Sequence, residues 1–131
     1  MIAASDLRKI ARARARDAKV LLGSRRFDGA FYLCGYSVEM ALKARICKTL
    51  KWPGFPETSH DFKGLQSVRT HDLDILLRFS GIESRIEQNY AWDWSVVIAW
   101  NPEKRYQSVG QSSEQQATDM LICTKRLLAV I

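Results

Sequence analysis

Residues 26–49 read RFDGAFYLCGYSVEMALKARICKT, and this stretch decides the fold. It contains no proline and only two glycines, so the sequence predicts one helix of about six turns. When successive residues turn by about 100°, five polar side chains share one narrow side, the polar strip of Asp28, Tyr32, Tyr36, Glu39 and Lys43. Most other positions are small or apolar, which is typical of a helix buried among other helices. We therefore expect this helix at the centre of the fold, with the polar strip left for chemistry or a partner.

The other periodic segments of the chain are also predicted to be helical. An amphipathic helix capped by Ser5 runs to about residue 22, and the tight turn at Gly23 makes it an antiparallel neighbour of the central helix. Further helices are expected over residues 71–80 with Thr70 as the cap, over 93–100, and from a capping box at 112–116 to residue 131. Residues 82–90 are compatible with one or two further turns. The sequence predicts a single domain, residues 1–131, folded as an all-α up-and-down bundle of four to five helices.

The segment from residue 50 to residue 69 breaks this periodicity. Pro53, Gly54 and Pro56 interrupt it, and it is longer than a connection between bundle helices needs to be. Loops of this length are either functional or disordered, and the sequence leaves both alternatives open.

Composition excludes several classes of protein. A hydrophobic content of 47% fits a folded domain and argues against disorder. The three cysteines are widely spaced without a C-x-x-C pair, which predicts buried, reduced thiols and a cytoplasmic location. We find no secretory signal and no apolar run long enough to span a membrane, so no membrane association is expected.

The positive charge of the chain is concentrated at its beginning. Residues 1–26 carry eight Lys and Arg against two Asp, whereas the basic and acidic side chains of the remaining residues balance. On the first helix a basic stripe faces away from the core, and it consists of Arg8, Lys9, Arg12, Arg16 and Lys19. Such a stripe suits the phosphate backbone of a nucleic acid, but a solvated helix face is the equally simple alternative.

Two further groups of residues, the histidines followed by Asp and a set of tryptophans, are candidate sites. The dipeptides at His60 and His71, each followed by Asp, lack an obvious third ligand, so no metal site and no cofactor are predicted. Trp92, Trp94 and Trp100 are expected to pack in the core or at a dimer interface.

A resemblance to a known family covers nearly the whole chain. FDGAFYLCGYSVEMALKA, then THDLDILL, then the pair Arg105-Tyr106, then the last helix SSEQQATDMLICTKRLL resemble the HEPN superfamily, the helical domains found in higher eukaryotes and prokaryotes. The resemblance implies a helical bundle that commonly forms homodimers. It also implies an RNase, a partner of a nucleotidyltransferase, or a nucleotide-binding module, in a toxin–antitoxin or defence context. The RNase motif Arg-x4–6-His does not occur at His60 or His71, so no catalytic residue is predicted.

The resemblance and the helix geometry together suggest a nucleotide or RNA site on the polar strip. Its candidate residues are Tyr32, Tyr36, Glu39, Lys43, Arg105 and Tyr106. Lys43 and Arg105 would supply positive charge for a phosphate while the tyrosines stack on a base. The alternative is that Glu39 and Lys43 are an ordinary surface ion pair four residues apart. A ribonuclease with a non-standard active site, and a purely structural dimerisation module, remain as competing functions. With no histidine expected near the strip, a docking surface is favoured over an active site.

Overall fold

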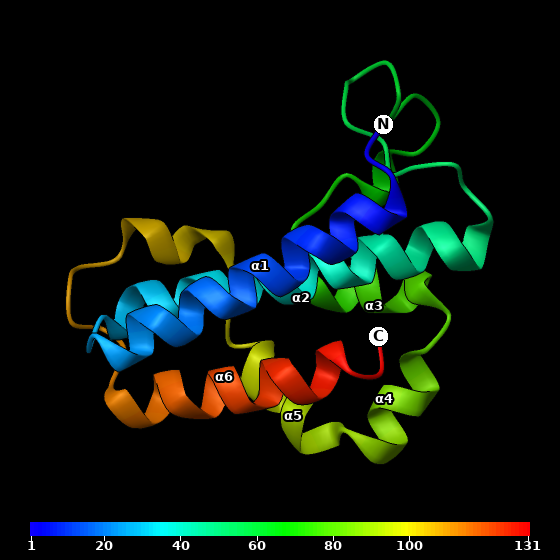
Figure 1. Ribbon diagram of the computed structural model, residues 1–131. Helices are drawn as coiled ribbons and strands as arrows, with labels where there is room; N and C mark the ends of the chain where they lie inside the picture. The colour runs from blue at the N-terminus through cyan, green and yellow to red at the C-terminus, as the bar shows by residue number, and fades with distance from the viewer.

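The computed structural model describes the backbone of all 131 residues and every side chain except those of Lys104 and Arg105. It is an all-α bundle, as predicted (Figure 1). In chain order the elements are α1 (Ala4–Gly23), α2 (Phe27–Leu50), the short 3₁₀ helix η1 (Gln66–Val68), α3 (Leu73–Ser80), α4 (Glu83–Asn89), α5 (Ala91–Val97), the second 3₁₀ helix η2 (Pro102–Tyr106) and α6 (Glu114–Leu128). The additional element relative to the prediction is α4, within the residues where further turns were expected.

The long helices α1, α2 and α6 form the body of the molecule, and they lie alongside one another in Figure 1. The prediction that α2 is central is confirmed, because it contacts α1, α3, α5 and α6. Its buried side chains come from nearly its whole circumference, including Phe31, Cys34, Val38, Leu42 and Ile46. A helix covered on so many sides has little surface left, so the composition of residues 26–49 did predict its position.

Helix α1 packs closely on α2 because three of its four buried side chains are alanines, namely Ala11, Ala15 and Ala18. The hydroxyl of Ser37 donates a hydrogen bond of 2.6 Å to the carbonyl oxygen of Ala11 across this contact. The prediction that Ser5 caps α1 is wrong. The N-cap is Ala3, because the preceding Ile2 is held in a backbone bridge to Phe55 and the helix begins directly after it.

Residues 51–69 form a packed loop on the end of the bundle near the start of α1 (Figure 1). Phe55 and Phe62 are buried, and their ring centroids lie 6.1 Å apart. The carboxylate of Asp61 accepts hydrogen bonds from the backbone N–H groups of Glu57 and Thr58, and these bonds lower its pKa. The loop is therefore packed by its own aromatic side chains.

Helix α3 begins later than the sequence predicted, and this changes the position of His71. The N-cap is Asp72 instead of Thr70, and its carboxylate accepts from the N–H groups of Asp74 and Ile75. The hydroxyl of Thr70 accepts from the N–H of Asp72 one step earlier. His71 consequently lies before the helix, where its side chain is free to turn toward α2.

The predictions for α6, the cysteines and the tryptophans hold in large part. Ser113 and Gln116 form the expected capping box of α6. All three cysteines are buried free thiols. Trp94 and Trp100 are buried in the core, whereas Trp92 is 70% exposed on α5.

Candidate functional site

A buried carboxylate is the centre of the candidate site. Glu39 lies on α2 and is only 1% exposed. One of its oxygens accepts a hydrogen bond from Nζ of Lys43 at 3.1 Å, and the other lies 2.7 Å from Nδ1 of His71. The interpretation of Glu39 and Lys43 as a surface pair is therefore wrong, because the residues before α3 cover this part of α2. A carboxylate removed from water needs such partners to remain charged.

The ammonium group of Lys43 is largely engaged in contacts within the protein. Its side chain is 14% exposed, and Nζ lies 5.2 Å from the centroid of the Phe55 ring in a cation–π contact. Its ammonium thus neutralises Glu39 and rests on the loop of residues 51–69. Little of this charge faces solvent, so Lys43 alone is a weak candidate for binding a phosphate.

His71 is the exposed member of this group. Its side chain is 56% exposed, and its Nδ1 faces Glu39. Because a carboxylate only accepts hydrogen bonds, Nδ1 carries the proton, and Nε2 is left to contact a ligand. The expectation that no histidine lies near the polar strip is wrong. The signal in the sequence was Asp72 as the better N-cap, which places His71 outside the helix.

An aromatic cluster adjoins this group one helical turn away on α2. The rings of Tyr32 and Tyr36 meet edge to face at 5.0 Å, and the ring of Trp100 lies 5.1 Å from that of Tyr36. The indole N–H of Trp100 donates to the carbonyl oxygen of Tyr32 at 2.9 Å. Trp100 fits here because Gly35 has no side chain, and a Cβ at that position would overlap the indole ring. The tyrosines predicted as site residues do lie together, but sequence reasoning missed Trp100 as their partner.

A pocket of about 550 Å³ lies between the start of α3 and the segment after α5. His71 and Trp100 both line it, so it joins the Glu39 group to the aromatic cluster. The remaining lining residues are Thr70, Asp72, Leu73, Asp74, Ile98, Asn101 and Pro102. The wall therefore combines apolar surface with a few polar groups, which is typical of a small-ligand site.

The other predicted site residues that the structure describes do not line this pocket. Tyr106 is 73% exposed on η2, and η2 contacts α2. The side chain of Arg105 lies outside the described residues, so its contribution stays a prediction. Asp28 accepts hydrogen bonds from the N–H groups of Gly110 and Ser112, and it therefore ties the loop before α6 to the start of α2.

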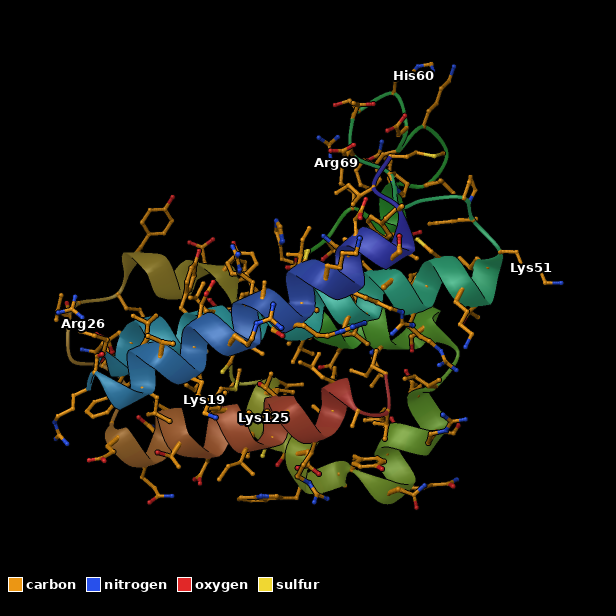
Figure 2. The ribbon with its side chains drawn as sticks, in the orientation of Figure 1. Lys19, Arg26, Lys51, His60, Arg69 and Lys125 are labelled. Atoms are coloured by element: carbon orange, nitrogen blue, oxygen red, sulfur yellow. The ribbon has the colours of Figure 1, made fainter. Side chains whose placement is uncertain are left out.

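The basic stripe is on the surface of α1, as predicted, with one exception. Lys9, Arg12, Arg16 and Lys19 are exposed, and only Lys9 among them has a described ion pair, with Asp6 at 3.6 Å. Arg8 is half-buried and departs from the stripe. Figure 2 shows Lys19 on α1 and Lys125 on α6, which is a neighbouring helix that packs against α1. The exposed members of the stripe are thus available to a polyanion.

The described part of the chain contains neither a metal-binding group nor a membrane-spanning helix. No group of three or more His, Cys, Asp or Glu side chains gathers there in a way that could hold a metal ion. None of the helices, over the residues described, has the length and apolar character needed to cross a membrane.

Comparison with known families gives the identity of the fold. A family model described as HEPN domain matches residues 4–131. The chain belongs to the HEPN family. Neither a curated protein nor a solved structure matches it. HEPN domains are typically nucleic-acid related, which agrees with the basic charge of α1. They also often dimerise.

Proposed function

We propose that this HEPN protein binds RNA or a nucleotide in the pocket between α3 and Trp100, with His71 as the main polar contact. The observation that carries the proposal is the 2.7 Å contact that holds the exposed His71 against the buried Glu39. Burying a carboxylate is costly for a protein unless the carboxylate is paired, and here the pairing orients an exposed imidazole. Its position at the edge of a pocket supports this assignment.

The walls of the pocket suit a nucleobase. Ile98 and Pro102 contribute apolar surface against which a flat ring can pack, whereas Trp100 lines the pocket but is only 3% exposed. Asp72 and Asp74 already accept hydrogen bonds within the protein, from backbone N–H groups and from the indole of Trp94 respectively. Each carboxylate has further lone pairs, and these can accept from the amino groups of a base. Tyr32 and Tyr36 contact the ring of Trp100 but are not among the residues that line this pocket.

A phosphate would be bound by groups other than Lys43, whose charge is used by Glu39. Protonated His71 can donate from Nε2 to a phosphate oxygen. Arg105 and Tyr106 remain candidates because η2 lies against α2. For an RNA longer than a few nucleotides, the exposed residues of the basic stripe would add contacts to the backbone.

Fluorescence anisotropy with a labelled single-stranded RNA of mixed sequence, and thermal melting with ATP or GTP, test this proposal. The variant His71→Ala should weaken binding about tenfold or more, because it removes the central donor without emptying the core. His60→Ala is the matched control, since His60 is the other histidine and is exposed in the loop. Equal binding by the wild type and His71→Ala would exclude the pocket as the site.

A second candidate function is RNA cleavage, and the same contact favours it. An imidazole oriented by a carboxylate can act as a general base toward the 2′-hydroxyl of RNA. Incubation with RNA should then give fragments with cyclic phosphate ends, and His71→Ala should abolish them. DNA of the same sequence is the control substrate, because it lacks the 2′-hydroxyl. RNA binding without any fragments would exclude cleavage and leave binding as the proposed function.

The partners implied by the family are also proposals for this chain. Two large apolar side chains lie exposed on α5 and α6, which pack against each other: Trp92 at 70% and Ile122 at 52%. Exposed apolar surface of this kind supports a homodimer contact. A nucleotidyltransferase partner and a role in a toxin–antitoxin or defence system rest on the family resemblance, and copurification with the product of a neighbouring gene would test them.

A further inference from the structure

The two carboxylates that line the pocket are held in fixed orientations, and each keeps one oxygen unused. Oδ1 of Asp72 accepts hydrogen bonds from the backbone N–H groups of Asp74 and Ile75 at 2.9 and 3.1 Å. Oδ1 of Asp74 accepts from the indole N–H of Trp94 at 3.0 Å. Among the described groups, none donates to Oδ2 of either residue. Because both side chains line the pocket, it offers a ligand two oriented acceptors.

The negative charge of these carboxylates is not compensated within the described part of the chain. Neither Asp72 nor Asp74 forms an ion pair with a described side chain. Two uncompensated carboxylates attract groups that donate hydrogen bonds, and they repel a phosphate. A nucleotide would therefore enter the pocket with its base first, and its phosphate would lie at the exposed His71.

The four RNA bases differ in the donors that they carry on the edge used for base pairing. Guanine carries donors on two neighbouring ring positions, the N1–H and the 2-amino group. Adenine and cytosine each carry one amino group beside a ring nitrogen that only accepts, and uracil carries a single N–H between two carbonyl oxygens. Two oriented carboxylate oxygens are therefore matched fully by guanine. Asn101 also lines the pocket, but its amide both donates and accepts and can serve any base.

We propose that this pocket selects guanine, with Asp72 and Asp74 accepting hydrogen bonds from the N1–H and the 2-amino group. The inference rests on the proposed function, because it names the base that would be bound at the same site. A site built to accept from a ligand N–H strongly rejects an analogue that lacks it, since the acceptor then loses water without gaining a partner. The guanine can belong to a free nucleotide or to single-stranded RNA, because the edge that is recognised is the same.

Isothermal titration calorimetry with GMP, IMP and AMP in one buffer tests the selection in the wild type. IMP lacks only the 2-amino group of GMP, and it should bind about tenfold more weakly because one hydrogen bond to a charged acceptor is lost. AMP also lacks the N1–H and should bind about tenfold more weakly again. Oligouridylates with one central guanine or adenine, competing against a labelled RNA, separate an RNA ligand from a free nucleotide.

Two conservative variants test whether the carboxylates make the selection. Asp74→Asn should lower the preference for GMP over AMP about tenfold, because an amide N–H replaces an acceptor. Asp74 is exposed and its remaining oxygen can still accept from Trp94, so the variant should fold. Asp72→Asn should act in the same way, since Asn is an equally good N-cap. Glu87→Gln, an exposed carboxylate of α4 outside the pocket, is the matched control. His71→Ala should weaken all three nucleotides by a similar factor and keep the preference.

The outcomes separate this inference from the proposed function. Equal affinities for GMP, IMP and AMP would overturn the selection of guanine and leave the pocket as a nucleotide site. A preference for GMP that persists in both Asn variants would overturn the assignment to Asp72 and Asp74. If neither the nucleotides nor the oligonucleotides bind, the proposed function fails and the selection of guanine fails with it. A preference for guanine that occurs only among the oligonucleotides would support the proposal with RNA as the ligand.

Discussion

Glu39 on α2 contacts His71 across 32 residues of sequence, with its carboxylate oxygen 2.7 Å from Nδ1 of the imidazole. The contact links the central helix to the segment that precedes α3. It leaves a buried carboxylate between an almost buried lysine and an exposed histidine. The position of Lys43 and the orientation of His71 at the pocket therefore depend on the same side chain.

Replacing Glu39 by Gln should lower the free energy of unfolding by about 3 kcal/mol, because Lys43 would keep its charge in a largely buried position without a counter-charge. Urea denaturation followed by circular dichroism measures this change. Glu87→Gln is the control, since Glu87 is an exposed carboxylate on α4 without a described ion pair. A loss of stability no larger than that of the Glu87→Gln control would mean that Lys43 reaches water when Glu39 is replaced by Gln.

Replacing Gly35 by Ala should displace Trp100, because the new methyl group would occupy the position of the indole ring. We expect a destabilisation of about 1–3 kcal/mol from this overpacking, with a shift of the tryptophan emission toward longer wavelength. Gly23→Ala is the matched control, since nothing lies within 4 Å of a Cβ there. If the Gly35→Ala variant has the same free energy of unfolding as the wild type, Trp100 can be displaced without loss of stability. The contacts of the aromatic cluster would then not hold Trp100 in one position.

The buried thiols should make stability depend on alkaline pH. Burial raises the pKa of Cys34 to about 12, and burial together with the charge of Asp93 raises that of Cys123 to about 11, from an ordinary value of 9.0. Above pH 9 the unfolded chain loses these protons while the native protein retains them, so stability is full below this pH. It should then fall by about 1 kcal/mol per thiol by pH 10.

Urea denaturation at pH 8, 9 and 10 measures this dependence, with Cys34→Ala as the comparison. The variant should lose less stability than the wild type between pH 8 and pH 10, because one thiol no longer titrates. Parallel curves for the two proteins would show that the Cys34 thiol is not protected. As a second readout, iodoacetamide should modify the cysteines far more slowly in the native protein than in urea.

If Trp92 lies in a homodimer contact, Trp92→Gln should shift the protein from dimer to monomer in light scattering after gel filtration. The exposed indole would bury most of its surface in such a contact, and aromatic side chains often dominate the binding energy of interfaces. Val109→Gln is the control, since Val109 is 96% exposed in the loop before α6. A wild type that is monomeric at every accessible concentration would remove the dimer proposal.

If the basic stripe contacts RNA, the affinity for single-stranded RNA should fall steeply as salt increases, by a logarithmic slope of about 0.7 for each phosphate contacted. The double variant Arg12→Gln, Arg16→Gln should reduce that slope by about 1.4. Lys51→Gln is the control, because Figure 2 shows Lys51 at the far end of α2 from the α1–α2 turn. Binding that stays constant between low and moderate salt would exclude the stripe as a contact.

Much of the fold could be read from local patterns. The helix over residues 26–49, the capping box at Ser113 and the small apolar face of α1 depend on residues three or four positions apart, and neighbours at this distance meet on any helix. The cysteines were predicted as buried, reduced thiols because they are widely spaced without a C-x-x-C pair, and all three are buried.

The N-cap at Ser5 was predicted wrongly because the long-range backbone bridge between Ile2 and Phe55 lets the helix begin directly after it, with Ala3 as the cap. The N-cap at Thr70 was predicted wrongly because Asp72, two residues later, caps α3 with its carboxylate.

The site could not be predicted from local patterns, because its contacts join segments that are remote in the chain. Helical periodicity placed Glu39 and Lys43 on one side of α2, but it could not show that the residues before α3 would cover that side and bury the carboxylate. Nor could it pair Glu39 with His71 or place Trp100 over Gly35. Local sequence determines which face of a helix is polar. Whether that face meets water, a counter-charge or another helix depends on how the whole chain packs.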